Sequence, residues 1–410
     1  MICPYIKIIT MTKQLFKFNN ILFCIVISLL SNHPISSQVY TSYDSLDETI
    51  NNYIRDNNIP GLVACVVIGN KIEWINSYGF SNIENKVEMK PDAIINIASV
   101  SKLFTTTAIM QLWEKDKISL KADINTYLPF SIRNPKFPGV PITIQQLLTH
   151  TSSIVDGSAL WESYSCGDPS ISLEYWVTNY FKPDGEFYNE KENFSENEPG
   201  SIDNYSNVGY GLLGYIVERV SGQTFNEYCN ENIFKPLEMV NSGWLISEID
   251  TANHITPYVY MSDDLRDDMA NNFNHLFPGE KEFKRFTNIA TCLYSCPNYP
   301  DGYVRTSIIE LSHFLIACMN NGEYKDNRIL KKQTLDLILS PQIEKNKNIG
   351  LGWHKEKIFW GHNGSDPGVQ SELFFNPETK IGIIIIQNSL EGESFDILKN
   401  IFNVVSADKK

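Results

Sequence analysis

The placement of the strand-length apolar segments constrains the fold most, because these segments lie near the two ends of the chain. Residues 62–68 form a continuous apolar run, and residues 72–78 follow it after a Gly69-Asn70 turn. Two such runs joined by a short turn predict a β-hairpin. Further strands are predicted near the other end, at residues 357–360, 370–376 and 381–387.

The middle of the chain has helical periodicity instead. Helices are predicted at residues 45–57, 99–115, 208–220, 225–233, 308–319, 331–339 and 395–405. The simplest packing joins the terminal strands into one sheet. We therefore expect an α+β fold, with an antiparallel sheet from both chain ends flanked by helices and a central, mostly helical lobe.

Two long polar segments interrupt the helical region, at residues 156–200 and 262–286. Long irregular segments inside a compact enzyme often cover active sites, and surface insertions without a role fit the same pattern. Both interpretations stay open on the sequence.

The first 37 residues are similar to a secretory signal peptide. Lys13 and Lys17 precede an apolar run at 21–30, and Ser36 and Ser37 follow it. This is the order of a secretory leader, and the run is too short to span a bilayer as a helix. An anchoring or buried helix is the alternative. We expect a mature domain at residues 38–410, secreted or periplasmic, with no stable membrane span after cleavage.

Cysteine usage and charge narrow the class of protein further. Of the 8 cysteines, Cys3 and Cys24 would leave with the leader. Some of the rest could pair in an oxidising compartment, and Cys292 and Cys296 are the nearest couple. The spacing of that couple does not fit a zinc site, so no metal or cofactor is expected. The net charge of −14 argues against a nucleic-acid partner.

Cys65 and Cys318 lie in apolar patterns, which predicts that they are core thiols.

The segment Ser99-Val100-Ser101-Lys102 opens the strongest predicted helix. Residues three apart share a helix face, so Lys102 can reach the Ser99 hydroxyl and help remove its proton. The backbone N–H groups at a helix N-terminus also suit a developing oxyanion. Alone, the pattern fits a surface Ser and Lys equally well.

Tyr205-Ser206-Asn207 lies in the turn before the 208–220 helix. A Tyr whose pKa is lowered by a nearby Lys can serve as general base and acid, and Asn207 could donate to a substrate carbonyl. Tyr228-Cys229-Asn230 has the same spacing, but it falls inside a helix, where packing is the better interpretation.

His362-Asn363-Gly364-Ser365 is the third segment that points to chemistry. Gly364 at a strand edge would let a substrate backbone approach closely. The N–H of Ser365 could then be a second oxyanion donor beside that of Ser99. A hairpin turn with an incidental His is the alternative.

In this order the three segments resemble the serine β-lactamase and penicillin-binding protein superfamily, which includes class C β-lactamases, DD-peptidases and related esterases. Further matching segments lie at residues 147–152, 199–200, 205–210, 236–239, 302–311 and 361–368. The resemblance covers residues 59–388.

The resemblance implies a serine hydrolase that works through a covalent acyl-enzyme. It assigns Ser99 as the nucleophile and Lys102 and Tyr205 as the proton-handling pair. It places Asn207, His362, Gly364 and Ser365 at the substrate and leaves His150 as a supporting residue.

Several positions depart from the family's pattern. His362 stands where the family has Lys, and Asn363 stands where it has Thr. Ser153 and Glu238 replace glycines. A His is only partly charged at neutral pH, which favours a peptidase or esterase over an efficient β-lactamase.

The expected partner is a small-molecule or peptide substrate. The candidates are D-alanyl or other D-amino-acid peptides, including cell-wall peptides, small esters and β-lactams. The alternative function is a non-catalytic penicillin-binding or sensor protein with the same fold.

Overall fold

A computed structural model describes residues 44–407, which contain one central sheet of seven strands. The expected signal peptide at 1–37 lies outside these residues. All neighbouring strands of the sheet pair antiparallel. In spatial order they are β12 (His354–Glu356), β13 (Phe359–Asp366), β14 (Val369–Asn376), β15 (Ile381–Gln387), β1 (Gly61–Ile68), β2 (Lys71–Asn82) and β3 (Val87–Glu88). The sheet is therefore built from both ends of the chain, as the sequence predicted.

The neighbouring strands β1 and β15 in the middle of the sheet are apolar apart from the terminal Gln387, because both faces of the sheet are covered. Successive side chains of a strand point to opposite faces. In β1, Cys65 and Val67 join the core on one face, whereas Leu62, Ala64 and Val66 join the core on the other. A continuous apolar run, rather than an alternating one, is the consequence.

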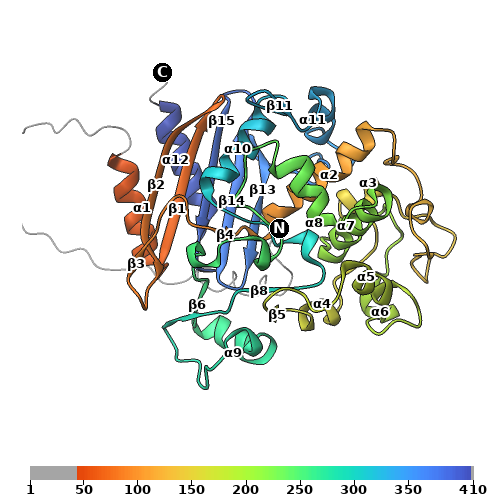
Figure 1. Cartoon of the computed structure of the whole chain (residues 1–410), viewed down its shortest axis with the longest axis horizontal. Helices are drawn as coiled ribbons and strands as arrows, with labels where there is room; N and C mark the ends of the chain where they lie inside the picture. Colours follow the sequence, from red (N-terminus) through yellow and green to blue (C-terminus); the bar gives the residue numbers. More distant parts are fainter. Residues whose placement is uncertain (1–43, 408–410) are drawn as a thin grey trace, which may run out of the picture.

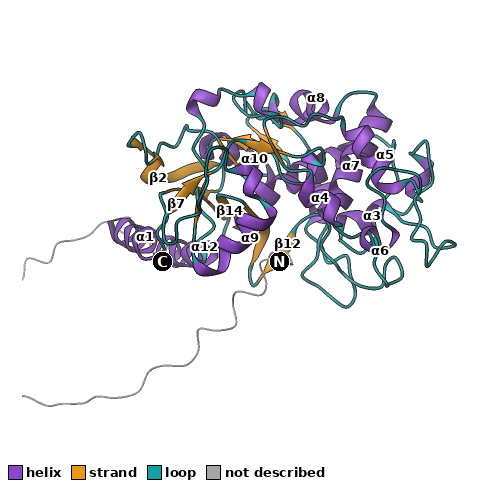
Figure 2. Ribbon diagram, turned by 90° about the horizontal axis from the view of Figure 1, so that it is seen from below, coloured by secondary structure: helices purple, strands orange, loops and turns teal. Residues whose placement is uncertain are grey.

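Two terminal helices cover one face of the sheet. They are α1 (Asp44–Asp56) and α12 (Ser394–Ala407), which lie side by side against it in Figures 1 and 2. Leu46 and Ile50 of α1 and Leu398 of α12 are buried in the core of this face. α10 (Ile308–Met319) packs on the opposite face, where the larger core extends into the helical lobe.

The lobe and its connections hold the remaining elements, most of them short. The helices of the lobe are α2 (Lys102–Glu114), α3 (Ile144–Leu148), α4 (Ser158–Glu162), α5 (Leu173–Phe181), α6 (Glu190–Asn193), α7 (Asn207–Ser221), α8 (Phe225–Cys229), α9 (Asp263–Asn272) and α11 (Lys332–Ile338). Short strand pairs are β4 (Ile95–Asn96) with β9 (Arg305–Thr306), β5 (Ser165–Cys166) with β8 (Tyr294–Ser295), β6 (Tyr258–Tyr260) with β7 (Asn288–Ala290), and β10 (Glu323–Tyr324) with β11 (Asn327–Arg328). One-turn helices include η2 (Ala98–Ser101), η4 (Asn230–Phe234) and η8 (Tyr299–Asp301).

Local expectations failed in three places. The strand predicted at 357–360 straddles a hairpin turn, since Lys357 has φ 57° and separates β12 from β13. Ser99 lies in the tight turn of η2, and the α-helix begins at Lys102. The segments 156–200 and 262–286 are not irregular, because they contain α4, α5, α6 and α9.

The two replaced glycines stand where the backbone is left-handed. Ser153 has φ 69° and Glu238 has φ 55°. Such a conformation costs a residue with a Cβ about 1–2 kcal/mol. Neighbouring polar groups offset part of this, since Asn134 donates to Ser153 Oγ at 2.5 Å and Lys325 pairs with Glu238.

Cys166 and Cys292 form a disulfide, so Cys292 does not pair with its neighbour Cys296. Cys65 and Cys318 are buried free thiols, as predicted. Between residues 44 and 407, no helix combines the length and apolarity that crossing a membrane requires.

Candidate active site

Ser99 lies at the meeting point of the sheet and the helical lobe. Its Oγ is 3.0 Å from Lys102 Nζ and 2.8 Å from the hydroxyl of Tyr205. Lys102 comes from the first turn of α2, and Tyr205 stands just before α7. Two side chains from distant parts of the chain, those of Lys102 and Tyr205, thus converge on the Ser99 hydroxyl.

The amine of Lys102 is fully buried and held from several sides. It donates to Asn207 Oδ1 and to the carbonyl of Asp301, each at 2.7 Å. The carboxylate of Asp301 lies 3.9 Å from the same nitrogen. A buried charge is stable only when it is paired and hydrogen-bonded, and this environment supplies both. A neutral amine, with two N–H groups committed in this way, would turn its lone pair toward Ser99.

Tyr205 is a neutral phenol in this environment. Burial raises its pKa well above the ordinary value of 10.0, and the hydrogen bond to Ser99 opposes the rise only in part. The expectation that a nearby Lys lowers this pKa was therefore wrong, although Lys102 Nζ lies 4.9 Å from the ring centroid. Exclusion of solvent is the largest cause of the rise, and repulsion from Asp301 adds to it.

His150 supports Tyr205 from behind. Its ring stacks on that of Tyr205 with centroids 4.3 Å apart, and its Nδ1 accepts the N–H of Ser206 at 3.0 Å. Burial, with Lys102 nearby, holds the pKa of His150 well below its usual range, so the ring is neutral and can accept this bond.

Asp156 fixes the start of α7, and sequence reasoning missed it. Its carboxylate accepts the N–H groups of Asn207 and Val208, both at 3.0 Å, and the Asn207 side-chain amide at 2.9 Å. A carboxylate at a helix N-terminus is favoured by the helix dipole. The Asn207 side chain is thus held between Lys102 and Asp156 while still lining the cavity.

The strand β13 brings its residues against the backbone of Ser99. A Cβ at Gly364 would lie 2.6 Å from the Ile97 carbonyl oxygen and 2.9 Å from the Ser99 nitrogen. Only glycine permits this approach. Ser365 and Asn363 line the same cavity as Ser99.

His362 does not line the cavity that Ser99 borders. It borders a much smaller pocket behind Tyr205, shared with His354, and its Nδ1 lies 2.5 Å from the Asn363 carbonyl oxygen. Burial and the neighbouring His354 and Lys102 keep the pKa of His362 well below its usual range. The ring is therefore neutral and offers no positive charge to a substrate.

A cavity of about 310 Å³ opens above Ser99. Both long segments contribute to its wall. Trp161 and Tyr164 come from the first, and Leu265 and Phe273 come from the second. The interpretation that these segments cover a site is thus favoured over that of surface insertions without a role.

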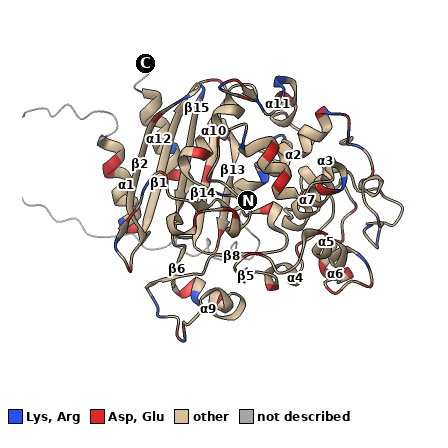
Figure 3. Ribbon diagram, in the orientation of Figure 1, with Lys and Arg blue, Asp and Glu red and all other residues tan. Residues whose placement is uncertain are grey.

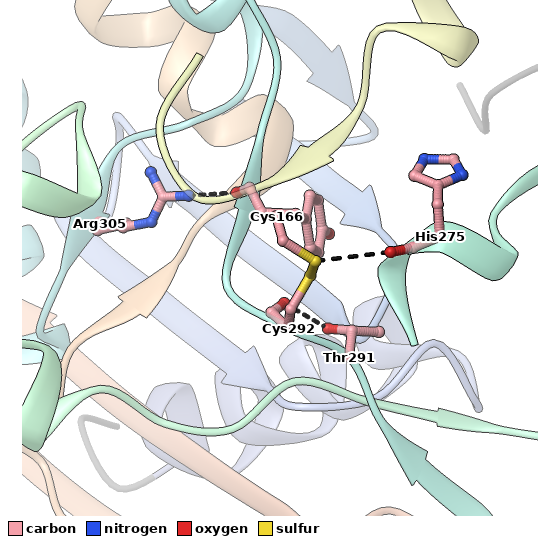
Figure 4. The surroundings of a disulfide bond; sticks show 6 residues. Cys166, His275, Thr291, Cys292 and Arg305 are labelled. Atoms are coloured by element: carbon pink, nitrogen blue, oxygen red, sulfur yellow. Dashed lines mark hydrogen bonds between the residues drawn. A yellow bond between two sulfur atoms is a disulfide. The ribbon is translucent and has the colours of Figure 1, made fainter. Parts of the chain in front are cut away.

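A disulfide joins the segment that follows the cavity-lining Tyr164 to the chain just before the neighbouring strand β8. Figure 4 shows the Cys166–Cys292 bond, with the carbonyl oxygen of His275 3.5 Å from Cys166 Sγ. Cys166 pairs with Tyr294 in a short ladder, and Tyr164 stacks on Tyr294 with centroids 5.9 Å apart. The bond therefore anchors β5, the strand that directly follows the cavity-lining Tyr164.

The Tyr228-Cys229-Asn230 segment is not part of the site. Tyr228 and Cys229 are buried in α8, as the helical context predicted. No cluster of three or more His, Cys, Asp or Glu side chains suited to a metal ion occurs among residues 44–407.

A sheet from both chain ends, a helical lobe and a Ser–Lys–Tyr cluster between them define the fold of the β-lactamase-type serine hydrolases. A family model described as Beta-lactamase matches residues 46–405. The chain belongs to the Beta-lactamase family.

Relatives by sequence are distant. Protein flp of Staphylococcus aureus strain MRSA252 is 24% identical over 356 residues, which are 85% of this chain and 63% of that protein. The chain thus spans less than two thirds of the length of this relative. The Putative penicillin-binding protein PbpX of Bacillus subtilis strain 168 is 29% identical over 48% of this chain and 44% of its own length.

Solved structures show the same fold. D-amino acid amidase from Ochrobactrum anthropi SV3, complexed with L-phenylalanine, has a TM-score of 0.70 at 18% identity and covers 90% of this chain and 99% of its own. The penicillin-binding protein from Bacillus halodurans has a TM-score of 0.66 at 23% identity, over 87% of this chain and 98% of its own. At these identities the likeness concerns the fold alone.

Proposed function

We propose that this protein is an exported serine hydrolase that cleaves an amide or ester through an acyl-enzyme on Ser99. The observation that carries the proposal is the double contact of Ser99 Oγ with Lys102 Nζ and the Tyr205 hydroxyl. A nucleophile within hydrogen-bond reach of its proton acceptor, itself oriented by a third group, is the signature of nucleophilic catalysis.

The proposed acylation begins when Ser99 Oγ attacks the substrate carbonyl carbon. Its proton passes to the neutral amine of Lys102, while the Tyr205 phenol gives its own proton to the departing nitrogen or oxygen and recovers one from Lys102. The N–H groups of Ser99 and Ser365 are the proposed donors to the oxyanion. Water then attacks the acyl-enzyme, and the same pair removes its proton and returns one to Ser99.

Export of the protein is the second part of the proposal. The apolar run after Lys13 and Lys17 supports it, and so does the Cys166–Cys292 bond, because structural disulfides persist mainly in oxidising compartments. Amino-terminal sequencing of the protein from culture medium or periplasm should find a start near Gln38. An intact leader on protein confined to the cytoplasm would contradict export.

Labelling with a fluorescent fluorophosphonate tests the nucleophile. The wild-type protein should be labelled, mass spectrometry should place the label on Ser99, and Ser99→Ala should lose it. Labelling of Ser99→Ala at the wild-type rate would remove this residue from the mechanism.

The substrate class is tested by turnover. We expect hydrolysis of p-nitrophenyl esters or D-amino-acid amides. We expect slower hydrolysis of a chromogenic β-lactam and of D-alanyl peptides that end in a carboxylate, because His362 offers no cation to such a group. A Ser99 adduct that forms with every substrate and never turns over would support the sensor alternative instead.

A further inference from the structure

The charge of the cavity is one-sided. Four carboxylates line it, from Glu162, Asp268, Asp301 and Asp366, and among the described residues no Lys or Arg does so. The nearest amine, that of Lys102, lies beneath the floor and is bonded to Asn207 and Asp301. Ion pairs with Lys or Arg are the strong way to hold a carboxylate, and no Lys or Arg among the lining residues supplies one here.

The four carboxylate side chains differ in their exposure to solvent. Glu162 is exposed on α4 and Asp268 is partly buried on α9, which is at the lower edge of Figure 3. Asp301 is buried, and Asp366 is partly buried like Asp268. One oxygen of Asp301, Oδ1, is buried without a hydrogen-bond partner. Burial, followed by repulsion from Asp301, raises the pKa of Asp366 to about 8, although Lys102 lowers it in part. A cationic group bound beside Asp366 would favour its ionised form.

Asp366 is the acidic residue of the cavity that adjoins a proposed oxyanion donor in the sequence. It follows Ser365 directly at the end of β13 and accepts a hydrogen bond from the Tyr164 hydroxyl at 3.2 Å. Trp161, Tyr164 and Phe273 add aromatic faces to the same cavity. Carboxylates set among aromatic rings form the environment that binds organic ammonium groups, through charge pairing and cation–π contact.

We propose that the cavity selects amides or esters that carry a positively charged ammonium group, with Asp366 as the residue that determines this specificity. The proposal rests on the hydrolase function of the same site. It predicts that substrates rank cationic, then neutral, then anionic.

Three p-nitrophenyl esters test the ranking above about pH 8, where most of the Asp366 carboxyl is ionised. The first is the ester of trimethylammonio-butyrate, whose charge does not titrate. The second is its isostere with carbon in place of the ammonium nitrogen, and the third carries a terminal carboxylate. Dividing each kcat/KM by the rate constant for hydrolysis of the same ester by hydroxide corrects for differences in intrinsic reactivity among the three esters. We expect a cationic-to-neutral ratio on the order of 10–100, because an ion pair in a partly buried site is stronger than one in water.

Substitution identifies the residue. Asp366→Asn keeps an acceptor for Tyr164 and should lower the cationic-to-neutral ratio about tenfold. Asp267→Asn is the matched control, because Asp267 is exposed on α9 beside Asp268 and does not line the cavity. The control should keep the wild-type ratio. A wild-type ratio at or below one, or an equal loss in the two variants, would overturn the proposal.

Failure of the hydrolase function is separable from failure of charge selection. Calorimetric titration of Ser99→Ala protein with the corresponding amides measures binding without turnover. Tighter binding of the cationic amide, with no hydrolysis by the wild type, would refute the proposed hydrolase function but not the charge selection. Turnover without a preference for the cationic substrate would refute the charge selection but not the hydrolase function.

Discussion

Gly364→Ala should inactivate the enzyme without unfolding it. The new Cβ would lie 2.5 Å from Ser371 Oγ, 2.6 Å from the Ile97 oxygen and 2.9 Å from the Ser99 nitrogen, against 3.4–4 Å in ordinary contact. Two of these three neighbours are backbone atoms. The third is also fixed, because Ser371 Oγ donates to the Ile97 oxygen at 2.6 Å in a buried site. The strand and the Ser99 turn must therefore separate by roughly half an ångström or more.

The separation affects activity more than stability. Overpacking of this kind costs about 1–3 kcal/mol, which corresponds to a fall of about 1–4 °C in Tm for a chain of this size. Loss of one aligned oxyanion donor lowers kcat by about 10²–10³. The expected result is a folded protein with a hundredth of the wild-type kcat or less.

Steady-state kinetics with a p-nitrophenyl ester and calorimetric melting measure the two effects on one preparation. Gly139→Ala is the matched control, because a Cβ there meets no atom within 4 Å and the backbone is not left-handed. The control should match the wild type in both assays. The reasoning fails if Gly364→Ala keeps its kcat within about threefold, or if its Tm falls below the assay temperature.

Three other predictions address the proton relay through Tyr205, the disulfide and a buried acid. Tyr205→Phe should lower kcat/KM by about 10²–10⁴ with little change in Tm, and a near-normal rate would leave the proton to Lys102 alone. Replacing Cys166 and Cys292 together by Ser should lower the unfolding free energy in urea by about 3–5 kcal/mol, since the bond closes a separation of 126 residues; a loss below about 1 kcal/mol would contradict this. Burial raises the pKa of Glu372 from 4.5 to about 8, so the folded protein binds this proton more tightly than the unfolded chain does and loses stability as pH rises between those values. Glu372→Gln should remove part of that loss in melts across the range, and identical pH profiles for variant and wild type would refute the assignment.

The sequence determined the features that depend on local spacing. The apolar runs at the positions of β1 and β15 predicted strands, and their burial on both faces of the sheet explains why neither has a polar side. The interval from Ser99 to Lys102 places the two side chains on one side of a single turn, whether that turn is a 3₁₀-helix or an α-helix. The boundaries of α10 and β15 agree with those predicted, because strong apolar periodicity and turn residues bound both.

Only the tertiary structure decided which groups share solvent-excluded space. Asp156 and Asp301 lie far from Ser99 along the chain, and no local pattern marks them as partners of the Asn207 helix and of Lys102. The direction of the Tyr205 pKa depends on whether burial or a cation dominates, which spacing cannot tell. The pairing of Cys166 with Cys292, and the gathering of Asp301 and Asp366 in one cavity, also follow from long-range packing. Such contacts depend on how many elements pack together. For that reason, no single sequence motif predicted that acidic residues would gather in the cavity.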